Sequence, residues 1–192
     1  RGSDPPHDGS LGNALDACRD ALLGLLDPWL RVADQALLGA LYSRMGHCDF
    51  MFGHFNQGIK TLAKAAQLCE AAGNTEDAGY AYVWLGWNHL YRGHYDIVLA
   101  VKKELLRTME RRFNPRWYIT GLCAASRACI CLGRWDTAVD EAKKALKVAE
   151  ESADNSLVVF AVWTLSMAYT WRGNLSRGVE YGELALQKAV TP

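Results

Sequence analysis

Four segments of this sequence share one pattern and stand 40 residues apart: GHCDFMFGHFNQG at residues 46–58, GWNHLYRGHYDIV at 86–98, SRACICLGRWDTA at 126–138 and SMAYTWRGNLSRG at 166–178. Each has a central glycine followed by a polar and then a large residue, as in Gly93-His94-Tyr95. Glycine or serine stands seven positions before that glycine. Three of the four segments have glycine or alanine five positions after it. A fixed period carried through spaced small residues indicates a repeat protein.

Each repeat is predicted to be a hairpin of two helices, named A and B in chain order. Glycine accepts the backbone angles that end a helix, and small residues let two helix axes approach to the near end of the ~8–10 Å range. Apolar residues between the glycines follow helical spacing, and no segment alternates as a strand would. The predicted fold is an all-α, right-handed α-solenoid of antiparallel hairpins. The expected helices are 28–52, 56–72, 76–92, 95–112, 116–132, 135–151, 156–172 and 175–189.

The ends of the chain depart from the regular period. Residues 29–190 are predicted to form four hairpins in one domain. Residues 11–28 read as the B helix of a partial repeat, because Gly12, Ala17 and Gly24 reproduce the offsets of the small residues. Residues 1–10 are polar and rich in Gly and Pro, which indicates a disordered lead or an added remnant. We expect a piece of a larger protein.

The spaced small residues resemble the tetratricopeptide repeat family over residues 12–190. Its 34-residue unit carries small residues at its positions 8, 20 and 27 and a large residue at position 17. In this sequence, position 17 is occupied by Phe55, Tyr95, Trp135 and Leu175. The period of 40 departs from the family and implies longer helices. Such long repeats are similar to those of sugar-sensing bacterial transcription activators and of large signalling ATPases or cyclases.

The resemblance implies that A-helix side chains line a concave wall, which is aromatic and nearly uncharged here. A large apolar patch is typical of an interface, so the wall is predicted to be a binding groove for a protein or peptide. Alternatively, its rings pack on one another or on flanking repeats, or bind a small ligand such as a sugar. The candidate residues are Phe50, Met51, Tyr80, Val83, Trp87, Leu90, Tyr91, Arg127, Phe160, Trp163, Met167 and Trp171.

Charge and hydropathy argue against two classes of partner. Lys plus Arg and Asp plus Glu number 21 each in 192 residues, so no net charge draws the chain to nucleic acid or to an anionic membrane. The longest uncharged stretch, 155–171, is shorter than the ~20 residues of a membrane span and contains Ser and Thr, which predicts a buried helix. With no signal peptide apparent, we expect a cytoplasmic location.

No catalytic or metal-binding pattern stands out. The six cysteines form no Cys-x-x-Cys pair, and neither a phosphate loop nor paired carboxylates occur. We therefore expect no enzyme activity, no metal and no cofactor, and instead a scaffold module of a regulatory or signalling protein. The family's two-carboxylate clamp needs Lys and Asn on the A helices. The matching positions here hold neither.

One basic stripe and the two solenoid ends remain as secondary candidates. Lys103, Arg107 and Arg111 follow i, i+4 spacing. They are interpreted either as the solvated convex face of a B helix or as a contact for an acidic partner or a phosphate. A solenoid without caps exposes its terminal apolar faces, so a homodimer through these ends is also expected.

Overall fold

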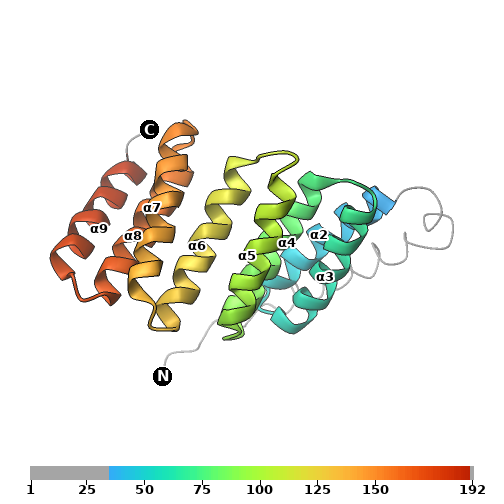
Figure 1. Ribbon diagram of the computed structural model, residues 1–192, viewed down its shortest axis with the longest axis horizontal. Coiled ribbons are helices and arrows are strands. Elements are labelled where there is room, and N and C mark those ends of the chain that lie inside the picture. Colours follow the sequence, from blue (N-terminus) through green and yellow to red (C-terminus); the bar gives the residue numbers. More distant parts are fainter. Residues whose placement is uncertain (1–34, 191–192) are drawn as a thin grey trace, which may run out of the picture.

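The computed structural model describes residues 35–190. These residues form an α-solenoid of eight helices with no strand, and Figure 1 shows the hairpins in a row. The all-α solenoid prediction is confirmed. The predicted partial repeat at 11–28 and the lead at 1–10 lie outside the described residues. The helices are α2 (Gln35–Met51), α3 (Phe55–Ala71), α4 (Thr75–Tyr91), α5 (Tyr95–Met109), α6 (Pro115–Cys131), α7 (Trp135–Glu151), α8 (Asn155–Trp171) and α9 (Leu175–Val190).

The four turn glycines end the A helices at equivalent places. Gly53, Gly93, Gly133 and Gly173 have φ between +70° and +89°, a left-handed conformation that costs glycine little. The turn is closed by the backbone N–H of the residue after each glycine; for example, His94 donates to the carbonyl of His89 at 2.9 Å. The glycines therefore set the spacing at which each B helix begins.

Side-chain caps begin the A helices α4, α6 and α8. Asn74 accepts from the backbone N–H of Asp77 at 3.2 Å, Asn114 from that of Trp117 at 3.3 Å, and Asp154 from that of Ser156 at 3.1 Å. The B helices α3, α5 and α7 start directly after the glycine turn without such a bond. An N-cap oxygen satisfies a backbone donor that the first helical turn leaves unpaired, so these caps fix where the last three hairpins begin, and the glycines fix where all four turn.

The small residues lie where the two helices of a hairpin cross. Ser126 Oγ donates to the carbonyl of Ala138 at 2.8 Å, and Ser166 Oγ makes the same bond to Gly178 at 2.7 Å. Ala145 is fully buried and Ala185 is 7% exposed. The predicted close crossings are confirmed in the third and fourth hairpins by these serine hydrogen bonds, and in the first by Gly46, where an added Cβ would lie 2.4 Å from Cγ of Leu62.

The helices form two layers. α2 contacts α4, α4 contacts α6 and α6 contacts α8, whereas α3, α5 and α7 each pack between two successive A helices. Successive helices lie closest together on the inner side of a curved solenoid, so the A helices form the inner wall. Ion pairs between neighbouring hairpins, such as Arg116 with Asp154 at 2.6 Å, use many of the balanced charges.

Candidate binding surface

Aromatic side chains from three A helices form a connected series on the inner layer. Phe50 of α2 lies 5.4 Å from Tyr91 of α4, centroid to centroid, and Tyr91 lies 6.3 Å from Trp87. Trp87 lies 5.9 Å from Phe160 of α8, and Phe160 lies 6.0 Å from Trp163. All these separations fall within the ~4.5–7 Å of favourable ring pairs. We call these five rings the aromatic series.

Arg127 of α6 lies among the rings of the flanking A helices. Its guanidinium carbon is 5.3 Å from the ring centroid of Trp87, 5.9 Å from that of Tyr91 and 5.5 Å from that of Trp163. A cation within ~6 Å of a ring is attracted to the negative ring face. The side chain of Arg127 therefore joins the rings of α4 to those of α8.

Exposure divides the residues predicted to line the groove. Tyr91, Trp163, Met51 and Trp171 are 52%, 42%, 66% and 61% exposed. Half-buried are Phe50, Tyr80, Arg127, Phe160 and Met167.

Three predicted groove residues do not reach the surface. Val83, Trp87 and Leu90 are at most 7% exposed and belong to the main core cluster. The physical reason is the direct contact between successive A helices, which covers side chains that point sideways from α4. Trp87 is thus the buried member of the aromatic series, and Val83 and Leu90 lie in the core behind the exposed wall rather than on it.

A neighbouring ring cluster surrounds Tyr80, the one member of it that the sequence-based candidate set contains. His47 of α2 stacks on Trp84 of α4 with centroids 3.7 Å apart, and its Nδ1 is hydrogen-bonded to the Tyr80 hydroxyl. Trp117 of α6 meets the Tyr80 ring edge-on at 5.0 Å. Burial, followed by the charge of Arg44, lowers the pKa of His47. Spacing alone gives no signal for Trp84, which stands one position beyond the expected inner positions.

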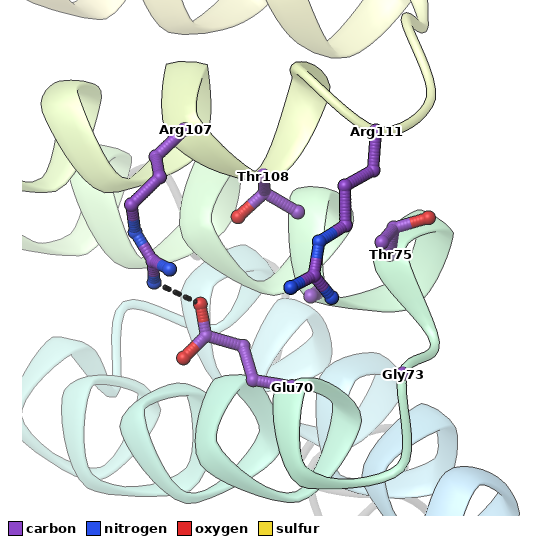
Figure 2. A pocket seen from close by; sticks show the side chains of 7 residues that line it. Glu70, Gly73, Thr75, Arg107, Thr108 and Arg111 are labelled. Carbon is purple, nitrogen blue, oxygen red and sulfur yellow. Dashed lines mark hydrogen bonds and ion pairs between the residues drawn. The ribbon is translucent and has the colours of Figure 1, made fainter.

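The basic stripe is divided by the structure. Arg107 is paired with Glu70 of α3 at 2.6 Å and with Glu104 at 2.8 Å, so it links two hairpins. Arg107 of α5 and Arg111 of the turn that follows α5 both line a hollow of about 110 Å³ (Figure 2). Lys103 is exposed and does not line this hollow. The three cations therefore do not converge on one site.

The buried thiols of Cys69 and Cys123 are poorly suited to nucleophilic chemistry. Burial raises the pKa of Cys123 to about 12 and that of Cys69 to about 11, so both stay protonated at neutral pH. Within residues 35–190, no three His, Cys, Asp or Glu side chains are grouped so that they could hold a metal ion. None of the helices described is both long and apolar enough to cross a membrane.

Comparison with known proteins supports the fold. No family model and no curated protein matches the sequence. Among solved structures, a Rap protein complexed with competence and sporulation factor is similar with a TM-score of 0.76 at 13% identity. The alignment covers 94% of this chain but 51% of that one, so this chain spans about half its length. BtubC (BKLC) from P. vanneervenii is similar with a TM-score of 0.75 at 16% identity, covering 95% and 74% of the two chains. At these identities the likeness shows a helical-repeat fold.

Proposed function

We propose that this chain is a non-catalytic binding module of the tetratricopeptide type, and that it holds a peptide segment of a partner protein on its inner wall. The observation that carries the proposal is the aromatic series with its exposed members Tyr91 and Trp163. In this proposal, residues 29–190 form the four-repeat domain, preceded by the partial repeat at 11–28. The module belongs to a larger regulatory or signalling protein of the cytoplasm.

The physical basis is the combination of exposed ring area with fixed ring positions. An aromatic side chain offers ~150–250 Å² of contact area, and about half of the Tyr91 and Trp163 side chains is open. Neighbouring rings already hold them, as Phe55 does by stacking on Tyr91 at 5.4 Å. A partner that packs on preordered rings loses less conformational entropy on binding. Apolar side chains of an extended peptide match such a wall.

Two further observations support the proposal. The similar solenoid of a Rap protein has been solved complexed with competence and sporulation factor, so a solenoid of this shape accommodates a partner. The raised pKa values of Cys69 and Cys123 keep these two buried thiols protonated, which agrees with a non-catalytic module.

The test compares two tryptophans of similar exposure in different layers. Trp163 on α8 is 42% exposed and Trp135 on α7 is 46% exposed. Peptides are first selected from a displayed random heptapeptide library with the full chain, and Kd values of the enriched peptides are then measured by calorimetry. We expect Trp163→Ala to weaken binding about 30-fold, which corresponds to the ~2 kcal/mol of an interface hot spot. Trp135→Ala is expected to bind within about twofold of wild type.

Two outcomes contradict the proposal. One is that the library yields no enriched peptide. The other is that both Ala variants, each with a wild-type helical circular dichroism spectrum, weaken binding equally.

A further inference from the structure

We infer that the peptide bound on the inner wall carries a carboxylate, from an Asp or Glu side chain, which Arg127 binds. This inference rests on the proposed function and specifies its ligand. It starts from the charge distribution of the inner wall. Residues 78–91 of α4, 117–131 of α6 and 155–171 of α8 contain no Asp, Glu or Lys, and Arg127 is their only Arg. The central wall therefore presents one fixed positive charge.

Arg127 differs from the other arginines in its surroundings. Six exposed arginines of the described chain are paired with carboxylates, as Arg44 is with Asp77, Arg134 with Asp96 and Arg172 with Asp136, while Arg92, Arg111 and Arg177 are exposed to solvent. Arg127 is half-buried. In the described part of the chain no Asp or Glu lies within 4 Å of it, and its partners are the three rings. Ring faces attract the charge but accept few of the five N–H donors of a guanidinium.

A carboxylate is the ligand that fits this arrangement. The guanidinium is planar and binds a carboxylate through two parallel hydrogen bonds. Surrounding rings exclude water, which strengthens a charge-assisted bond. A single cation holds one carboxylate, with apolar residues of the peptide on the rings of α4 and α8 to either side.

The experiment uses the full chain and the displayed heptapeptide library. We expect the enriched peptides to contain Asp or Glu flanked by aromatic or aliphatic residues. One enriched peptide is then synthesised with its acidic residue and again with the matching amide, Gln or Asn. Wild type should bind the acidic form at least tenfold more tightly, and this preference should fall as the salt concentration rises. With Arg127→Met the two forms should bind within about twofold of each other.

Arg111→Met is the matched control. It removes the same charge from an exposed position in the turn after α5, away from the three rings, and should keep the tenfold preference. If Arg127→Met does not fold, as judged by circular dichroism, the Nε–Hε resonance of Arg127 in the wild-type chain supplies the readout. It should shift on titration with the acidic peptide and not with an equal occupancy of the amide form.

The outcomes separate the two proposals. The role of Arg127 is overturned if the enriched peptides lack an acidic residue, or if Arg127→Met still prefers the acidic peptide. Neither result contradicts the proposal that the inner wall binds peptides. The same holds for an Arg127 resonance that responds equally to both peptides. A library that yields no binder overturns the proposed function and this inference together.

Discussion

Glycines at one repeat position offer a direct test of the packing, because their surroundings differ. Gly46 and Gly86 both stand seven residues before a turn glycine and both are buried. A Cβ on Gly46 would lie 2.4 Å from Cγ of Leu62 and 2.9 Å and 3.1 Å from its two methyl carbons. A Cβ on Gly86 would have its nearest contact at 3.7 Å, with Cγ1 of Val101. Replacement by alanine should therefore have opposite effects on stability.

The magnitudes follow from two competing contributions. Alanine is favoured over glycine inside a helix by ~0.8–1.0 kcal/mol. At Gly86 nothing opposes this, so Gly86→Ala should stabilise the fold by about 1 kcal/mol. At Gly46 the new methyl meets the branch carbon of Leu62, which is fully buried, so the contact cannot be relieved by moving only the flexible end of a side chain. Overpacking costs ~1–3 kcal/mol, and its upper range applies here, so Gly46→Ala should destabilise by about 1–2 kcal/mol.

Thermal unfolding of the two variants, followed by circular dichroism under one set of conditions, measures the difference. At ~2–4 °C per kcal/mol for a chain of this size, their midpoints should differ by about 4–12 °C, with wild type between them. Because solenoids can unfold in parts, hydrogen exchange of α2 and α3 locates the effect. The reasoning is refuted if Gly46→Ala is as stable as wild type, or if Gly86→Ala unfolds first.

Two more predictions concern a strained turn and a half-buried histidine. Ala153 has φ +54° at the position where an earlier repeat has Gly73. This conformation costs a non-glycine residue ~1–2 kcal/mol, whereas the greater entropy of glycine in the unfolded chain costs ~0.4–1 kcal/mol. Ala153→Gly should therefore raise the free energy of unfolding in urea by about 0.5–1 kcal/mol, and an unchanged or lower urea midpoint contradicts this. Burial, then Arg44, lowers the pKa of His47 below its usual 6.5, so the unfolded chain binds protons more readily and stability is lost as pH falls below about 6.5. The urea midpoint should be higher at pH 7.5 than at pH 5.5, and His47→Phe should shrink the gap; an unchanged gap in that variant would show that other groups control it.

The sequence predicts helix ends well where local chemistry sets them. Of the predicted helix ends within the described residues, all but that of α5 lie within one residue of those observed. α5 ends at Met109, three residues before the predicted end. Pro115 favours an extended residue before it, and Asn114 has φ −126° and ψ 109°. The turn before α6 also lacks a glycine like Gly73, so the chain takes a longer path.

The binding surface is less predictable, because exposure depends on residues from other repeats. A repeat position tells which way a side chain points, but not whether the next A helix covers it. The repeat positions of Trp87 and Trp163 both predict the wall, yet Trp87 is 5% and Trp163 is 42% exposed. Likewise, the sequence marks Arg127 as a lone charge. Its ring partners come from the preceding and the following repeat, and only the fold brings them together.

Some positions of the repeat determine the packing of the helices, and others determine the chemistry of the inner wall. Glycines and small residues at fixed positions set the turns and crossings. The residue that follows the small one, by contrast, is His47, Trp87, Arg127 and Met167 in the four repeats. These four have different surroundings: His47 stacks on Trp84, Trp87 is in the core, Arg127 lies among rings, and Met167 packs against a second core cluster. Because the residue at this position differs between repeats that share the same crossings, it can determine which ligand the wall binds. The only charge at this position is in the third repeat, so the acidic residue of a bound peptide should lie over α6, with apolar residues over α4 and α8.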